Sequence, residues 1–175
     1  ICAEGYLFEL ERRGYLQAGA FVPAAVLDHP DEVRQLHREF VHAGSDVVEA
    51  FTYYGHREKL RLIGKEHLLA DLNREALRIA GEVAAESGTL LAGNICNTNL
   101  FEPGSNESAT QVRAMFEEQV AWAVEANADF IIGETFSYTE EALIALEVIK
   151  QTKLAAVITM AFHRADTTRE GDTAG

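Results

Sequence analysis

The alternation of short apolar runs with helical patterns constrains the fold of this chain more than any other feature of its sequence. The runs lie at residues 46–51, 89–95, 129–133 and 154–160, with a partial run at residues 1–3. They are brief and mostly not alternating, which is typical of parallel strands covered on both faces. The sequence therefore predicts a β-sheet whose strands are separated by helices.

Helix start and stop signals fill the intervals between these runs. The expected helices extend from Asp28, as cap, to Gly44; from about His67 to Ser87, before Gly88; from the capping-box pair Ser108 and Gln111 to Asn127; and from near Thr139. Each carries an apolar stripe that can cover a sheet, and the last stripe is expected at Leu143, Leu146 and Ile149.

Strands that alternate with helices imply right-handed crossovers and a parallel sheet. A doubly wound nucleotide-binding sheet usually shows GxGxxG or a P-loop, and the sequence contains neither. A (β/α)8 barrel has no such requirement but typically needs ~250 residues. We therefore expect an α/β fold in which residues 1–175 form about the first half of a TIM barrel, strands one to five, as the N-terminal portion of a single domain. Residues 163–175 are expected to form a loop or a frayed end.

Charge and cysteine content narrow the classes of partner. The net charge of -13 argues against nucleic acid and against an anionic membrane surface, since both attract basic proteins. Two cysteines make no disulfide framework, and no apolar run is long enough to span a bilayer. These features predict a cytoplasmic protein whose partners are small molecules, with a homo-oligomer left open.

Parallel sheets bind ligands beyond the carboxyl ends of their strands, and this rule selects candidate residues. In "DFIIGETF", Glu134 follows directly on the apolar run at residues 129–133 and can pair with an ammonium group or accept a proton, although a glutamate there can also be a helix-capping or solvated loop residue. Other strand ends offer Glu4, Gly5, Thr52, Tyr53, Tyr54, Asn94, Cys96, Asn97, Thr98 and Thr135.

Three of these features remain open between a functional and a structural role. The two tyrosines can pack at a rim, or one ring can face a ligand cation. Glu49 lies inside a strand and can point into a barrel or pair with a basic residue. Cys96 can be a nucleophile or metal ligand, but a buried inert thiol is more common. The six scattered histidines do not predict a metal site.

Three segments resemble the N-terminal half of the betaine–homocysteine S-methyltransferases and, more broadly, the homocysteine S-methyltransferase family. They are "ELERRGYLQAG", "HPDEVRQLHREFVHAGSDVVEAFTYYGHREKL" and "ADFIIGETFSYTEEAL". The resemblance implies a zinc-dependent barrel enzyme that moves a methyl group from an onium donor such as glycine betaine to the thiol of homocysteine, giving methionine. It also implies that Glu134 holds the amino group of homocysteine. By the same likeness Tyr53, Tyr54 and Thr52 belong to the pocket loop, and Glu4 and Gly5 to the loop at the amino acid end.

The chain departs from the family at these same contacts. The family has Asp-Gly-Gly where this chain has Ala3-Glu4-Gly5, a threonine at Ala50 and a tyrosine at Thr135. A different donor or thiol acceptor, a non-catalytic amine or amino acid binding protein, and a lyase with Glu134 as general base therefore remain alternatives. The zinc cysteines of the family follow later strands, beyond Gly175, and neither Cys2 nor Cys96 matches them. We expect no metal ligand in this segment, and zinc only in the complete protein.

Overall fold

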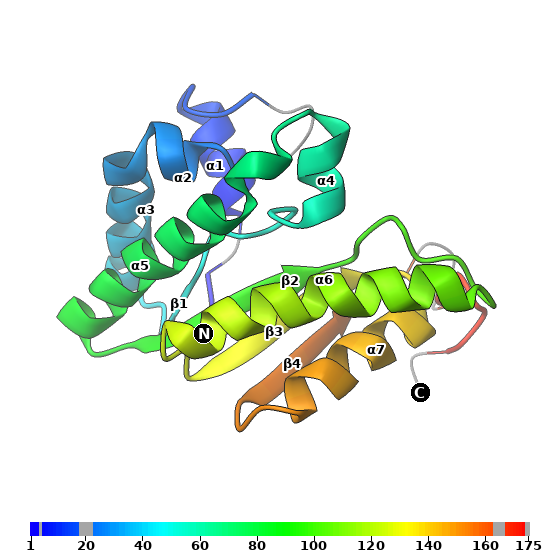
Figure 1. Cartoon of the computed structure of the whole chain (residues 1–175). Coiled ribbons are helices and arrows are strands. Elements are labelled where there is room, and N and C mark those ends of the chain that lie inside the picture. The colour runs from blue at the N-terminus through cyan, green and yellow to red at the C-terminus, as the bar shows by residue number, and fades with distance from the viewer. Residues whose placement is uncertain (4, 18–22, 163–166, 174–175) are drawn as a thin grey trace.

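A parallel four-stranded sheet forms the centre of the computed structural model, which describes residues 1–3, 5–17, 23–162 and 167–173. The strands follow one another in chain order, β1-β2-β3-β4 (Figure 1). Their bounds are β1 Val47–Glu49, β2 Leu90–Cys96, β3 Phe130–Phe136 and β4 Ala155–Met160. The partial run at the start of the chain contributes an isolated parallel bridge, from Cys2 to Val47. All five predicted strand positions are thus confirmed, the first as a single bridge.

Helices lie between successive strands and cover one face of the sheet (Figure 1). Here α5 contacts β1 and β2, α6 contacts β2, and α7 contacts β3 and β4. The helices are α1 Tyr6–Arg12, α2 Ala25–Asp28, α3 Pro30–His42, α4 Arg57–Leu62, α5 Leu69–Ser87, α6 Asn106–Glu125 and α7 Thr139–Lys150, with a 3₁₀ turn, η1, at Glu66–Leu68. In the described part of the chain, none of them is both long enough and apolar enough to cross a membrane.

The starts of two helices differ from the prediction. Asp28 is the last residue of α2 and does not cap α3, whose first residue is Pro30 with its backbone already set for a helix. The cap of α6 is Ser105, whose hydroxyl oxygen accepts a hydrogen bond from the Ser108 N–H at 3.2 Å. Ser108 lies inside the first turn, where its own hydroxyl bonds the backbone of Glu102. The capping box expected at Ser108 and Gln111 was therefore wrong.

The apolar stripe of α7 is rotated from the expected one. Leu143 is 52 % exposed, whereas Ile149 is fully buried. The face that packs on the sheet is formed by Ala142, Ile144, Ala145, Val148 and Ile149. Three short helices, α1, α2 and α4, were not predicted, because four to seven residues are too few to establish a helical period.

A close approach between α6 and the sheet fixes the main core. A Cβ added at Gly93 in β2 would lie 2.7 Å from Cβ of Ala123 and 2.7 Å from Cδ1 of Ile131. Glycine is therefore the residue that lets the helix pack directly on the strands. The large side chains of this core, including Phe116 and Phe136, fill the space between the sheet and its helices.

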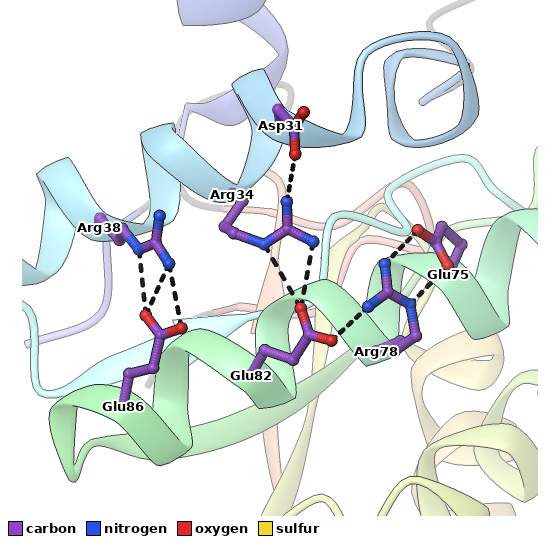
Figure 2. A network of polar contacts seen from close by, with 7 residues as sticks. All are labelled: Asp31, Arg34, Arg38, Glu75, Arg78, Glu82 and Glu86. Carbon is purple, nitrogen blue, oxygen red and sulfur yellow. Dashed lines mark hydrogen bonds and ion pairs between the residues drawn. The ribbon is translucent and has the colours of Figure 1, made fainter.

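Ion pairs connect α3 to α5 on the outside of the molecule (Figure 2). Arg34 bonds Glu82 at 3.1 Å, and Arg38 bonds Glu86 at 2.9 Å. Arg78 extends the network along α5 by pairing with Glu82. Exposed pairs of this kind contribute roughly 0–1 kcal/mol each, so the buried side chains between the two helices dominate their packing.

Candidate functional site

Polar side chains replace apolar ones toward the carboxyl ends of three neighbouring strands. The face of the sheet opposite the main core carries a small cluster formed by Val47, Ala92 and Ile132. Successive residues of a strand point to opposite faces, so the residues two positions further along share the face of this cluster. Those residues are Glu49, Asn94 and Glu134.

A cavity of about 500 Å³ opens at this edge of the sheet. It is lined by Gly5, Tyr6, Leu7, Phe8, Glu49, Ala50, Phe51, Tyr53, Tyr54, Lys59, Asn94, Glu134 and Thr135. Six of the strand-end residues selected from sequence therefore meet in one place: Gly5, Tyr53, Tyr54, Asn94, Glu134 and Thr135. Glu4, also predicted, lies outside the described residues.

The side chain of Asn94 joins two carboxylates at the floor of this cavity. Its Nδ2 donates hydrogen bonds to Oε1 of Glu49 and to Oε1 of Glu134, each at 2.6 Å. Glu49 is only 4 % exposed and Asn94 5 %, while Glu134 is partly exposed. Of the two alternatives left open for Glu49, the structure shows the inward orientation. The floor thus presents hydrogen-bond acceptors and negative charge, a combination suited to a cationic group.

Two adjacent tyrosines with tilted rings and a lysine form another part of the lining. The rings of Tyr53 and Tyr54 lie with centroids 4.3 Å apart, and the Lys59 Nζ lies 4.2 Å from the centroid of the Tyr54 ring. The cation over this ring therefore comes from the chain itself, from α4. Burial raises the pKa of Tyr53 well above its ordinary value, so its phenol stays neutral and can donate a hydrogen bond.

A bulge near the end of β3 turns Phe136 away from the cavity and into the main core, while Glu134 keeps the face that strand alternation gives it. The pairing of β3 with β4 shifts between Gly133 and Phe136, and Thr135 adopts a left-handed backbone with φ 58°. Without this extra residue, Glu134 and Phe136 would point to the same face; instead Phe136 is in the main core. A β-branched residue in this conformation is strained by about 1–2 kcal/mol.

Hydrogen bonds hold Thr135 in this conformation. Its hydroxyl donates to the backbone carbonyl of Glu134 at 2.8 Å and accepts from Nδ2 of Asn97 at 2.9 Å. The Tyr53 hydroxyl lies 3.3 Å from the same oxygen atom. The bulge is therefore fixed by the loops that follow β1 and β2.

Two strand-end residues from the sequence prediction lie beneath the cavity. Thr52 is buried and donates its hydroxyl to the Asn94 carbonyl at 2.8 Å, which links the ends of β1 and β2. It is not one of the lining residues. Cys96 is also buried, and burial raises the pKa of its thiol. The structure therefore favours the inert alternative for Cys96.

Lys59, Tyr6, Leu7 and Phe8 line the cavity but were not predicted. The last three belong to α1, a helix of seven residues that shows no clear period. Lys59 lies within a run of alternating charges, where the sequence offers no means of separating a cavity lysine from a solvated one.

A second, larger hollow of about 690 Å³ lies between α5 and α6. It is lined in part by Arg74, Trp122 and Asp129. Asp129 immediately precedes β3, so this hollow is near the amino ends of the strands, away from the candidate residues. The strand-end cavity is therefore the better candidate site for this fold.

The described residues do not form a zinc site. Among them, no three His, Cys, Asp or Glu side chains are grouped so that they could hold a metal ion. Cys2 donates its thiol to Oε2 of Glu49 at 3.5 Å, and Cys96 accepts from a backbone N–H. Neither cysteine belongs to a ligand set in this part of the chain.

Comparison with known proteins identifies the family. The family model described as homocysteine S-methyltransferase matches residues 5–175. Betaine–homocysteine S-methyltransferase 1 of Bos taurus is 40 % identical over 160 residues, and S-methylmethionine–homocysteine S-methyltransferase BHMT2 of Pongo abelii is 38 % identical over 155. Both alignments cover 89 % of this chain. The chain spans about two fifths of the length of these relatives, 39 % and 41 %.

Solved structures bear on the fold. The homocysteine methyltransferase MmuM from Escherichia coli, in its metallated form, matches 97 % of this chain and 65 % of its own with a TM-score of 0.80, at 19 % identity. This likeness confirms the predicted α/β barrel class, of which the described strands form one part. With the family model matched over nearly the whole sequence, the chain belongs to the homocysteine S-methyltransferase family.

Proposed function

We propose that this chain is the N-terminal portion of a zinc-dependent barrel enzyme that transfers a methyl group from an onium donor, such as glycine betaine, to the thiol of homocysteine, giving methionine. One observation carries the proposal: Glu134 and Tyr54, which are 80 positions apart in the sequence, line the same cavity. Family membership and the names of the matched relatives support the reaction class.

The lining residues are suited to an amino acid substrate. The carboxylate of Glu134 can accept hydrogen bonds from the α-ammonium group of homocysteine, and Lys59 can attract its carboxylate. Binding through both the ammonium group and the carboxylate fixes the orientation of the thiol relative to the donor. Such positioning supplies a large part of the rate acceleration of a two-substrate reaction. We assign Glu134, Tyr53, Tyr54, Gly5 and Thr135 to substrate binding, with Thr52 supporting the loop and Glu4 placed with them by the family likeness alone.

Zinc, when bound, would hold the thiol of homocysteine as a thiolate at neutral pH. The family likeness places its cysteine ligands beyond Gly175, and the described residues offer no set that fits it. We therefore assign this part of the protein to holding and orienting the two substrates. The aromatic rings of Tyr53 and Phe8 can face an onium head group, which supports a charged donor. A reducing cytoplasm suits the free thiol that the reaction needs.

The test is the substitution Glu134→Ala in the full-length protein. Loss of a charge-assisted contact worth about 1.5–3 kcal/mol should weaken homocysteine binding by at least about tenfold in calorimetry. Thermal unfolding should change little, since Glu134 is only partly buried. The matched control is Glu102→Ala, which removes an exposed carboxylate from the loop after β2. Unchanged homocysteine affinity in the Glu134 variant would refute the assignment.

A further inference from the structure

The bridge from Asn94 to two glutamates is the least expected arrangement in the cavity. Both hydrogen atoms of the Asn94 amide nitrogen are used, one for Glu49 and one for Glu134. The three residues come from three adjacent strands, β1, β2 and β3. The bridge therefore depends on the order of the sheet and on the stagger of its strands.

The orientation of this amide is fixed by its surroundings. If the amide were turned over, its oxygen would face both carboxylates, and like partial charges would repel. In the observed orientation Oδ1 is buried and accepts no hydrogen bond from the described residues. Within the described ranges, one buried acceptor thus has no partner while both N–H groups hold the carboxylates.

Glu49 is held from a second direction as well. Its Oε2 accepts a hydrogen bond from the thiol of Cys2, which forms an isolated parallel bridge with Val47 of β1. Glu49 and Glu134 accordingly approach the same nitrogen atom while lining the same cavity. Two carboxylates brought together in this way raise the local negative potential, which a cation bound between them would relieve.

We propose that Asn94 is a positioning residue that holds Glu49 beside Glu134, and that the two carboxylates together bind the primary ammonium group of the thiol substrate. This inference rests on the proposed function and adds a second ligand, Glu49, to the one that the family likeness implies. A primary ammonium has three N–H donors and can bond both carboxylates. A quaternary ammonium has none, so the pair favours the thiol amino acid over a quaternary donor at this end of the cavity.

The experiment compares two ligands that differ only in the ammonium group. Homocysteine and 4-mercaptobutanoate share the thiol and the carboxylate, and the second lacks the amino group. Their affinities are measured by calorimetry in the full-length protein for wild type, Glu49→Gln, Asn94→Ala and Glu134→Gln. The control is Glu141→Gln, a buried glutamate that accepts hydrogen bonds from Thr98 at the same end of the sheet but does not line the cavity.

Glu49→Gln and Asn94→Ala should each weaken homocysteine binding by at least about tenfold and leave 4-mercaptobutanoate binding unchanged, while Glu141→Gln changes neither. Equal weakening of both ligands would indicate general damage to the cavity and would overturn the inference. The inference would also be overturned if Glu49→Gln kept the wild-type affinity for homocysteine while Glu134→Gln lost it. That result would leave the proposed function intact. Failure of the wild-type protein to bind homocysteine would overturn the proposed function itself. Glu49→Gln keeps its acceptor oxygen, so it decides the question if Asn94→Ala does not fold.

Discussion

The backbone N–H of Tyr54 donates a hydrogen bond to Sγ of Cys96 at 3.2 Å, and this contact ties the loop after β1 to the end of β2. Burial is the main cause of the raised pKa of Cys96, and the nearby Glu134 and Glu141 carboxylates act in the same direction. A thiol that stays protonated is a poor nucleophile. Cys96 thus supports the cavity wall and is not set up to react.

We expect Cys96 to resist alkylation in the folded protein. Treatment with iodoacetamide at pH 7.5, followed by peptide mass mapping, should leave Cys96 unmodified under native conditions and modify it fully in guanidinium chloride. The denatured sample is the control for the chemistry of the peptide. Modification of native Cys96 at the rate of a free thiol would contradict both its burial and its supporting role.

The ammonium group of Lys59 lies over the Tyr54 ring in the cavity. Lys59→Gln removes the positive charge that can attract a substrate carboxylate. Homocysteine and 4-mercaptobutanoate both carry that carboxylate, so calorimetry should show both weakened by roughly tenfold, the value of about 1.4 kcal/mol. This pattern differs from the one expected for Glu49→Gln.

A lysine outside the cavity provides the control for this substitution. Lys153 is exposed in the turn before β4, and Lys153→Gln should leave both affinities unchanged. Stronger binding of homocysteine alone in Lys59→Gln would place Lys59 near the ammonium group, because like charges repel, and would contradict the proposed orientation of the substrate.

Local patterns explain which parts of this structure could be predicted. The strands and the end of α5 at Gly88 follow from short-range signals, namely apolar runs and a glycine with positive φ. Glu134 could be selected because its position at the carboxyl end of a parallel strand follows from the local sequence, without knowledge of any long-range contact. The start of α6 was missed because Ser105 and Ser108 offer equivalent caps, and only the loop that uses the Ser108 hydroxyl decides between them.

The interior of the site depended on contacts between distant segments. Asn94 was visible as a strand-end residue, but its bridge to Glu49 and Glu134 requires the register of three strands. The bulge at Thr135 is set by side chains from two other loops. Contacts between distant segments cannot be inferred from the periodicity of one segment. The sequence therefore predicts which residues lie at the carboxyl edge of the sheet, but not the hydrogen bonds that connect them.

Two buried histidines predict how stability depends on pH. Burial, with a smaller effect of Arg34, lowers the pKa of His37 to about 3; burial, with a smaller effect of Lys59, lowers that of His56 to about 4. Both are neutral in the folded protein, whereas the unfolded chain protonates them below about pH 6.5. The free energy of unfolding should therefore be highest above this pH. It should fall between about pH 6.5 and pH 4, by up to about 1.4 kcal/mol per unit for each histidine.

Urea unfolding of the full-length protein at pH 7.0, 6.0 and 5.0 measures this slope. His56→Asn keeps an acceptor for the Lys59 N–H, which the His56 Nδ1 now accepts at 3.4 Å, and removes one titrating group. The dependence of its unfolding free energy on pH should be shallower, corresponding to about one proton fewer taken up on unfolding. His42→Asn, at an exposed position at the end of α3, should keep the wild-type dependence. Equal slopes in wild type and His56→Asn would show that His56 is not buried in its neutral form.

The same substitution at two glycines, Gly81 inside α5 and Gly88 directly after it, should have opposite effects on stability. Gly88 ends the helix with φ 71°, and an added Cβ there would meet no atom within 4 Å, so the backbone conformation alone opposes alanine. Gly88→Ala should lower the free energy of unfolding by about 1–2 kcal/mol. Gly81 lies inside the helix, and its added Cβ would make an ordinary contact with Leu91 Cδ2 at 3.5 Å. Gly81→Ala should therefore raise stability by about 0.5–1 kcal/mol, since alanine favours the helix more than glycine does.

Each glycine variant is the control for the other, because the added atoms are identical. Unchanged m-values in urea denaturation would show that neither substitution alters the surface exposed on unfolding, so that the free energies of the two variants can be compared directly. A stabilising Gly88→Ala would mean that the helix does not end in a left-handed residue. β2 begins only two residues after Gly88, so the conformation of this glycine sets the direction in which the chain leaves α5 and enters the sheet. A different conformation there would therefore also change how α5 packs on β1.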